Sequence, residues 1–582
     1  MKYSDILAGW LREFGFTHYF YVGGGNIMHL TESLSNHLTG IPVIHEVAAV
    51  IASEYFNETA PTDQKAIALV TAGPGLTNTI TGIAGAWLEN RFVLVLGGQV
   101  KTSDLKGEAN IRQRGIQEID GVTLVSSICK RSVRLLKPVS KNTIFGLIQE
   151  CDSDKKGPLF IELPLDVQAN TYSDDEHELM STITRLNDNA INEEYLETLL
   201  SSWDHAKRPI LLIGGGVSRK TSIEINNLLQ NREVPVCTTY NGADRIDGNY
   251  QYYFGRVNTW GQRSANIIIQ KSDLIIAVGT RLGLQQTGFN WKEFGREAKI
   301  IQIDIDKNEL EKGHPRVDVG ICADANPLLL EFLKRINVSV PKNWIKYCHS
   351  LQSQIPRIEP INNTGSNYIS PYNFIITLEQ LTEREDIIIP CSSGSAFTLT
   401  MQLWQQKLGQ KIVTNKSLAS MGYGLSGAIG ASVANPSRRT ILLEGDGGFA
   451  QNMQEIGTAK IIDLNLKVFI FNDQGHASIR MTQRNYFKGK YLGCDNQTGL
   501  GLPNWLNLFQ GWDIGVTTIN RGFEIDEDFL EKFSNKSLEI FIVQIDPEQT
   551  YFPKIASRVN QDGGMESNPI DKMTPDIDYI NK

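Results

Sequence analysis

The sequence predicts an α/β protein made of three doubly wound parallel-sheet domains. Short apolar runs alternate with helical stretches along the chain, as parallel strands alternate with the helices that cover them. Several apolar runs end directly in glycine-rich turns, which is where open parallel sheets bind ligands. The 582 residues are too many for one hydrophobic core, and they divide into three blocks of similar size.

The first predicted domain covers residues 1–180, with apolar runs at 41–44, 66–71, 92–97 and 159–163. A polar, acidic stretch at about 168–190 indicates a linker. The second domain covers 190–345, with runs at 210–213, 274–278 and 300–305. A linker rich in Pro, Asn and Ser leads to the third domain, 368–548, with runs at 387–390, 441–443, 468–471 and 540–545. The tail, 549–582, lacks periodicity and is expected to fold over a neighbouring surface.

Composition narrows the classes of function. The formal net charge of -9 argues against a general nucleic-acid or anionic-membrane binder. The seven cysteines are scattered without a CxxC pair, which favours a reduced, cytoplasmic compartment. No run of ~18 apolar residues predicts a membrane span.

Two oxygen-rich turns in the third domain predict a metal site. Gly445-Asp446-Gly447-Gly448 follows one apolar run, and Asn472-Asp473-Gln474-Gly475 follows the next. Glycine backbone N–H groups and a helix N-terminus attract a phosphate, but a carboxylate repels it. A Mg²⁺ ion between them removes the conflict, because it prefers oxygen ligands and bridges carboxylates to phosphates. The alternative is an ordinary strand-to-helix turn that binds nothing.

These two turns resemble the motif of thiamine-diphosphate (ThDP) enzymes, and the resemblance extends over essentially the whole chain. It implies pyrimidine-binding, central and diphosphate-binding domains in that order. It also implies that Asp446 and Asp473 bind Mg²⁺ through their side chains and Gly475 through its carbonyl. The family usually has Asn where this chain has Asp473, so an extra negative charge faces the diphosphate.

The resemblance also implies residues that contact the cofactor ring. Glu46 is the acid expected to hydrogen-bond the aminopyrimidine and so promote proton loss from the thiazolium ring. The alternative for Glu46 is a carboxylate that only stabilises a helix N-terminus. Met421 is the apolar wedge under the bent cofactor, unless it is a core residue. The remaining cofactor-binding set is Gly24, Gly25, Pro74, Asn78, Ser395, Ala396, Ala419, Gly445, Gly447, Gly448, His476, Ala477 and Ser478.

Within the family the first domain resembles acetolactate synthases, on TAGPGLTNTITGIAGAW, VLVLGGQV and RGIQEIDGVTLVSSICKRSV. Gln117 matches a Gln that reaches the active site, unless it is a solvated side chain. No histidine lies between His45 and His177, where pyruvate-decarboxylase relatives carry the pair that releases an aldehyde. This absence favours transfer of the two-carbon unit to a second carbonyl. His476 either donates a proton there or is a plain loop residue.

The acceptor segment differs from acetolactate synthases, which carry a Trp at the position of Thr482. Arg480 and Arg484 flank Thr482 and could hold a phosphate, or they form a solvated basic loop. The leading hypothesis is a carboligase, a lyase and transferase that decarboxylates pyruvate or a similar 2-keto acid. Its acceptor is expected to be a nucleotide-linked keto-sugar, as in ThDP proteins of bacterial surface-polysaccharide biosynthesis.

Two alternatives remain from the sequence. One is an acetolactate synthase with a small 2-keto acid as acceptor, and the other is a ThDP-fold binding protein without turnover. The resemblance further implies a homodimer or homotetramer with active sites between subunits. Turns at 214–216 and 279–281 are compatible with FAD, but the R-F-D-D-R segment of acetolactate synthases is absent, which favours a central domain without FAD.

Overall fold

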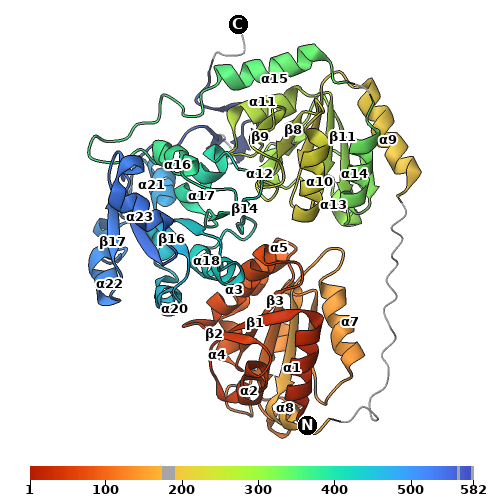
Figure 1. Ribbon diagram of the computed structural model, residues 1–582, viewed down its shortest axis with the longest axis vertical. Helices are drawn as coiled ribbons and strands as arrows, with labels where there is room; N and C mark the ends of the chain where they lie inside the picture. Colours follow the sequence, from red (N-terminus) through yellow and green to blue (C-terminus); the bar gives the residue numbers. More distant parts are fainter. Residues whose placement is uncertain (173–190, 338, 560–563, 578–582) are drawn as a thin grey trace. The chain divides into compact units, whose positions relative to one another are not determined.

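Three six-stranded parallel sheets form the framework, as the sequence predicts (Figure 1). The computed structural model describes residues 1–172, 191–337, 339–559 and 564–577. The chain divides into two compact units. One comprises residues 1–185, 387–396 and 413–543, and the other comprises 186–386, 397–412 and 544–582.

The first sheet has the strand order β2-β1-β3-β4-β6-β5. Its strands are β1 (Phe16–Tyr21), β2 (Thr39–Pro42), β3 (Lys65–Val70), β4 (Leu94–Gln99), β5 (Arg131–Arg134) and β6 (Leu159–Pro164). The helices of this domain are α1 (Tyr3–Phe14), α2 (Met28–Ser35), α3 (Glu46–Thr59), α4 (Pro74–Thr77), α5 (Ile80–Leu88), α6 (Gly121–Val125), α7 (Lys141–Cys151) and α8 (Leu165–Ala169).

Both faces of the first sheet are buried, which confirms the doubly wound prediction. Along β3, Ile67 and Leu69 pack in one core cluster with residues of α1, α2 and α7. Ala68 and Val70 point to the opposite face and pack with residues of α3 and α5. Because successive side chains of a strand alternate between faces, a run buried on both sides reads as continuously apolar.

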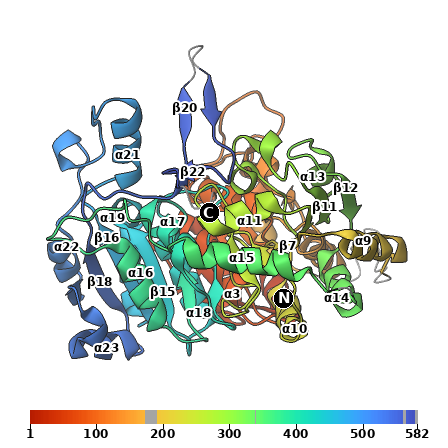
Figure 2. The ribbon, with the colours of Figure 1, turned by 90° about the horizontal axis from the view of Figure 1, so that it is seen from above.

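The third sheet repeats this topology, with the order β14-β13-β15-β16-β18-β17. Its strands are β13 (Ile387–Ile389), β14 (Lys411–Ile412), β15 (Thr440–Gly445), β16 (Leu466–Asn472), β17 (Val516–Ile519) and β18 (Glu539–Gln544). Its helices are α17 (Gly394–Leu403), α18 (Tyr423–Ala434), α19 (Asp446–Phe449), α20 (Ile456–Ile461), α21 (Ala477–Tyr486), α22 (Trp505–Gly511) and α23 (Glu527–Ser534), while α16 (Pro371–Gln380) falls in the other compact unit. Helix α18 lies along β15 (Figure 2).

Helices α3 and α18 cross in direct contact and share one core cluster. A Cβ atom on Gly427 would lie 2.7 Å from the ring of Tyr55, and one on Gly430 would overlap the backbone carbonyl of Ala52. The two glycines therefore allow the backbones to approach more closely than any side chain would permit.

A buried ionic network lies beside this crossing. The Glu54 carboxylate accepts hydrogen bonds from Nη1 of Arg91 (2.7 Å), the Tyr423 hydroxyl (2.8 Å) and Nδ2 of Asn415 (3.1 Å). Nη2 of Arg91 donates to the carbonyl of Thr414 at 2.9 Å. Burial raises the pKa of Glu54, and the Arg91 charge opposes that rise. The network holds the first and third domains together through charge as well as apolar contact.

The central sheet has the order β12-β11-β10-β7-β8-β9, with one buried core cluster of its own. Its strands are β7 (Pro209–Ile213), β8 (Val236–Thr238), β9 (Tyr253–Arg256), β10 (Leu274–Val278), β11 (Lys299–Asp304) and β12 (Val319–Cys322). Its helices are α9 (Glu193–His205), α10 (Arg219–Leu229), α11 (Arg263–Lys271), α12 (Leu284–Thr287), α13 (Lys307–Glu311), α14 (Ala325–Arg335) and α15 (Lys342–Gln354). The order is that of a Rossmann-like sheet.

The first linker and the C-terminal tail contain regular structure that the sequence does not predict. Residues 173–190, most of the first linker, lie outside the described residues, and α8 occupies its start. The tail contains strands β19 (Lys554–Ile555) to β22 (Met573–Thr574), which pair antiparallel in two small sheets, so it is more regular than its sequence indicates. Within the described ranges, no helix is both long enough and apolar enough to cross a membrane.

Candidate active site

The two predicted metal-binding turns meet at one edge of the third sheet. Strands β15 and β16 pair in parallel, with Gly445 opposite Phe471, so Asp446 and Asp473 follow neighbouring strand ends. Both side chains are buried. The Asp446 carboxylate accepts hydrogen bonds from the N–H of Gly447 (2.7 Å) and of Gly475 (3.1 Å), which ties the two turns together. The structure thus gathers the three residues that the sequence assigns to Mg²⁺.

The electrostatics of these turns fit a divalent cation. Burial and the neighbouring Asp473 raise the pKa of Asp446 well above its usual range. Burial also raises the pKa of Asp473 to about 7, while Arg480 opposes the rise. Arg480 offsets the charge of Asp473, and a cation beside Asp446 would offset the other carboxylate, because Mg²⁺ takes oxygen ligands of this kind. The described residues contain no cluster of three His, Cys, Asp or Glu side chains, so this site has two carboxylates and relies on backbone oxygen for further ligands.

Two glycines are required in these turns. A Cβ atom on Gly447 would overlap Nδ1 of His476, so the imidazole ring lies directly against the Asp446 turn. Gly475 has φ +155°, and a Cβ there would meet the carbonyl of Cys494. That carbonyl accepts the N–H of His476 at 2.8 Å. His476, Ala477 and Ser478 therefore lie at the start of α21, next to the metal turns, as predicted.

The predicted ring-binding residues of the first domain also come together. Glu46 opens α3 and is 9% exposed, and its Oε2 accepts a hydrogen bond from Nδ2 of Asn78 at 2.9 Å. Pro74 occupies the first turn of α4. Gly73 adopts φ +64°, and a Cβ there would lie 2.7 Å from the carbonyl of Gln117, so the Gln117 backbone borders this turn. The Gln117 side chain is exposed.

The remaining predicted residues also lie in loops or helix starts that follow strands. Gly24 packs against the side chain of Thr71 in the loops that follow β1 and β3, and Gly25 lies beside it in the chain. Ser395 and Ala396 are in the first turn of α17, after β13. Ala419 has φ +55°, a conformation that is costly for a residue with a Cβ. Met421 precedes α18 and is 39% exposed, so its side chain is accessible to a ligand at this place.

Sequence reasoning missed a polar link between the first and third domains of the chain. The buried Glu455, in the short helix Met453–Glu455, accepts hydrogen bonds from the N–H of Ile44 (3.2 Å) and of His45 (2.9 Å). These donors immediately precede Glu46, and Glu455 lies shortly after Asp446 in the chain. The only sequence signal was a glutamate next to apolar residues in QEIGTA.

The structure corrects both interpretations of Arg480. The sequence allows this side chain to hold a phosphate or to lie in a solvated basic loop, but it is 3% exposed and its Nη2 lies 2.6 Å from Oδ1 of Asp473. Its charge is already engaged inside the protein. The Thr482 hydroxyl donates to the Ser478 carbonyl within α21, and Nε of Arg484 donates to the Tyr491 hydroxyl at 3.3 Å.

The two glycine turns of the central domain are hydrogen-bonded to each other. Gly214 and Gly216 donate their N–H groups to the carbonyls of Val278 and Gly279, each at 2.9 Å. These two donors are therefore already used and do not form a free cradle for a flavin diphosphate.

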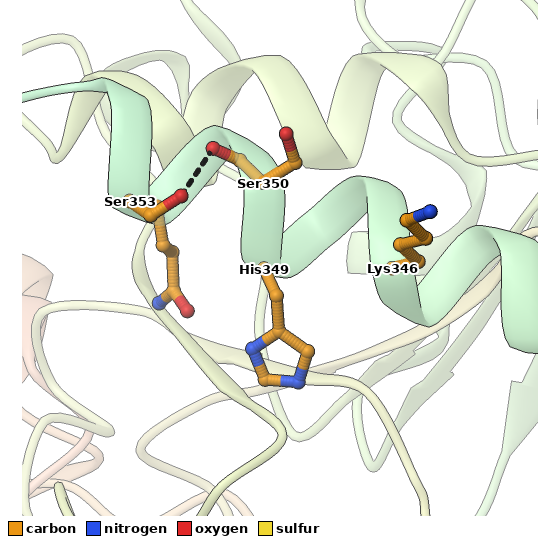
Figure 3. A pocket seen from close by; sticks show the side chains of 5 residues that line it. Lys346, His349, Ser350 and Ser353 are labelled. Atoms are coloured by element: carbon orange, nitrogen blue, oxygen red, sulfur yellow. Dashed lines mark hydrogen bonds between the residues drawn. The ribbon is translucent and has the colours of Figure 1, made fainter.

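A hollow on the surface of the central domain is unrelated to these residues (Figure 3). Side chains of α15 line it, with the Ser353 hydroxyl donating to the Ser350 carbonyl at 2.9 Å. His349 packs its ring edge against Phe254, 5.3 Å between centroids. The hollow contains no carboxylate and none of the predicted site residues.

Comparison with protein families agrees with the geometry. Residues 1–124 match the thiamine pyrophosphate enzyme N-terminal TPP binding domain, residues 196–335 the central domain, and residues 392–543 the C-terminal TPP binding domain. The chain belongs to the thiamine pyrophosphate enzyme family. ThDP is therefore its cofactor, with the Mg²⁺ that is typical of the family, and the two carboxylates and the Gly475 carbonyl fit that metal.

Similar proteins match over most of their length. A probable acetolactate synthase large subunit of Methanococcus aeolicus is 29% identical over 91% of this chain and 90% of its own. The acetolactate synthase isozyme 2 large subunit of Escherichia coli is 26% identical over 94% and 96%. Acetolactate synthase 2 of Nicotiana tabacum is 28% identical over 89% and 78%. This ThDP enzyme is thus of the acetolactate synthase-like type.

Proposed function

We propose that this protein decarboxylates pyruvate, or a similar 2-keto acid, and joins the two-carbon unit to a carbonyl acceptor. The observation that carries the proposal is the presence of two prepared half-sites in one compact unit: Glu46 with Asn78, and Asp446 with Asp473 and Gly475. ThDP, when bound, supplies the carbon that attacks the keto acid and holds the electrons released with CO₂.

The residues of the chain have separate tasks in this proposal. Asp446, Asp473 and the Gly475 carbonyl hold Mg²⁺ and through it the diphosphate. Glu46, kept in place by Asn78, hydrogen-bonds the pyrimidine ring and controls its protonation. Met421 supports the bend between the rings, and His476, beside the metal turns, is the candidate proton donor. In this family the two half-sites that enclose one cofactor come from different subunits, so we propose a homodimer or homotetramer.

Two acceptors are compared. A small 2-keto acid, as in an acetolactate synthase, is favoured by the full-length similarity to enzymes of that name. A nucleotide-linked keto-sugar is favoured by Thr482 in place of the usual Trp and by Arg484, although Arg480 no longer contributes to that argument. We place the small 2-keto acid first. We also propose that the central domain functions without FAD, since Gly214 and Gly216 have no free N–H group.

The decisive experiment is CO₂ release from pyruvate with ThDP and Mg²⁺, for the wild type and Glu46→Gln. We expect a loss of about a hundredfold or more, as for removal of a general acid–base group. Glu13→Gln, an exposed carboxylate of α1 in the same domain, is the matched control and should retain activity. Equal rates for wild type and Glu46→Gln would remove Glu46 from the mechanism.

Product analysis separates the acceptors. Acetolactate from pyruvate alone, at the rate of CO₂ release, identifies a small 2-keto acid as acceptor. A new mass only when a nucleotide keto-sugar is added identifies the sugar. ThDP binding by calorimetry without CO₂ from any 2-keto acid would instead indicate a binding protein without turnover.

A further inference from the structure

Arg480 is a buried charge that the catalytic proposal does not use. It lies in the second turn of α21 and is 3% exposed. Its Nη2 donates to both Oδ1 and the backbone carbonyl of Asp473, each at 2.6 Å. Its Nη1 donates to the carbonyl of Gln474 at 3.4 Å and lies 4.0 Å from Oδ2 of Asp495. The guanidinium is therefore aimed at the backbone and side chain of one metal turn.

The burial of Arg480 excludes simple surface roles. A guanidinium this enclosed cannot also bind a phosphate of a substrate without leaving Asp473 unpaired. Its Nε has no hydrogen-bond partner among the described residues, so the side chain is not held by a full set of bonds at its base. The interactions of the guanidinium with the turn at 473–474 offset the free-energy cost of removing it from water.

The charge balance explains why an arginine is there. Asp473 occupies the position where the family usually has a neutral Asn, which adds one negative charge beside the diphosphate. Arg480 adds one positive charge in direct contact with that carboxylate. The pair together carries no net charge, as an Asn does, and still offers carboxylate oxygen. The guanidinium fork also fixes the carbonyl of Gln474, next to Gly475, whose own carbonyl is assigned to the metal.

We propose that Arg480 is a positioning residue for the cation site, and that Asp473 and Arg480 act as one neutral ligand unit in place of Asn. This inference rests on the proposed function, because it concerns the Mg²⁺ and ThDP of that site. It makes the identity of residue 473 depend on residue 480. An Asn at 473 is tolerated only when Arg480 is also neutral.

A double-mutant cycle tests this dependence in the full-length protein. The variants are Asp473→Asn, Arg480→Gln and the two combined. ThDP affinity is measured against Mg²⁺ concentration by quenching of the fluorescence of the nine tryptophans. We expect each single variant to bind ThDP about tenfold or more weakly, because each leaves one buried charge unpaired. The combined variant should return to within about threefold of the wild type.

Controls separate positioning from folding. Arg480→Lys keeps the charge without the fork and should lie between the wild type and Arg480→Gln, which keeps the test usable if the Gln variant folds poorly. Lys532→Gln removes an exposed partner of Asp528 in the same domain and should not alter ThDP or Mg²⁺ affinity. Thermal unfolding without ThDP reports any purely structural loss.

The outcomes are distinct. A combined variant that binds ThDP as weakly as the sum of its singles would overturn the neutral pair and reduce Arg480 to loop packing. Single variants with wild-type affinity would also overturn it. A wild type that binds no ThDP at any Mg²⁺ concentration would overturn the proposed function itself.

Discussion

The first and third domains have the same strand order but different residues at the ends of their central strands. Thr71 follows β3 in the first sheet, and Asp446 follows β15 at the same place in the third. Val100 follows β4, and Asp473 follows β16. The same parallel scaffold thus presents a hydroxyl and an apolar side chain in one domain and two carboxylates in the other. The position is set by topology, and the chemistry by one residue at each strand end.

The edge strands extend this comparison. Strand β2 leads to Glu46 and α3, while β14 leads to Ala419, Met421 and α18. The two residues assigned to the cofactor rings therefore precede or open equivalent helices. Those helices cross where Gly427 and Gly430 allow close approach. Glu46 thus offers a carboxylate at the start of α3, and Met421 offers an apolar support just before α18.

The largest effect is expected where the two strand ends differ most. Asp446→Asn removes the negative charge of a proposed metal ligand, and we expect Mg²⁺-dependent ThDP binding to weaken about a hundredfold or more. Thr71→Val changes the equivalent residue of the first domain at constant shape and should leave the Mg²⁺ affinity unchanged. Titration of tryptophan fluorescence with Mg²⁺ at fixed ThDP measures both. An equal loss in the two variants would break the comparison.

The ionic network between the domains should carry the next largest effect. Glu54→Gln leaves Arg91 buried without its nearest carboxylate, and we expect a loss of about 3 kcal/mol in the free energy of unfolding. Replacing both charges, with Glu54→Gln and Arg91→Met, should cost less than the single change. Denaturant unfolding followed by circular dichroism gives the three values. A double variant less stable than the single one would show that Arg91 is useful without Glu54.

The helix crossing offers a matched pair of glycines. Gly430→Ala places a Cβ onto the carbonyl of Ala52 and should destabilise the protein by about 1–3 kcal/mol. Gly146 lies inside α7 of the first domain, with nothing within 4 Å of an added Cβ. Gly146→Ala should therefore stabilise by about 0.5–1 kcal/mol. Midpoints of thermal unfolding check both, and the same sign in the two variants would contradict the crossing geometry.

A pH-dependent effect is expected at a buried lysine of the third sheet. Lys467 in β16 donates to Oδ1 of Asn535 at 2.7 Å, whereas the equivalent strand β4 carries no charge. Burial lowers the pKa of Lys467 from 10.5 to about 8. Between these pH values the unfolded chain holds a proton that the folded protein lacks, so folding becomes more favourable as pH rises. The wild type should gain stability relative to Lys467→Met from pH 8 to pH 10.5, as followed by urea unfolding. A constant difference would show that Lys467 does not titrate there.

The sequence was informative wherever a strand ended in a turn of distinctive composition. Asp446, Asp473 and Gly475 lie together, because neighbouring parallel strands bring their ends to one edge. Glu46 and Asn78 were also brought together as expected. The sequence does not predict the short edge strands β5, β9, β12, β14 and β17 or the three-residue strand β8, since two to four residues have no period to detect.

Long-range polar contacts could not be read in advance. Glu455 and the N–H of His45 are 410 residues apart in the chain, so only the packing of two domains joins them. In the sequence, Arg480 lies in a basic and polar segment with no sign of a buried partner. Its contact with Asp473 depends on how α21 packs against the turn. The tail forms strands by pairing with other tail residues, as β19 pairs with β22. Such short paired segments leave no helical or alternating pattern in the sequence.

The crossing of α3 and α18 has a mechanical consequence. With bare backbone against backbone at Gly430, no compliant side chain can absorb a shift of one helix relative to the other. A displacement at the start of α3 is therefore transmitted to the start of α18. Glu46 and Met421, which lie at those starts, are mechanically coupled within a single chain.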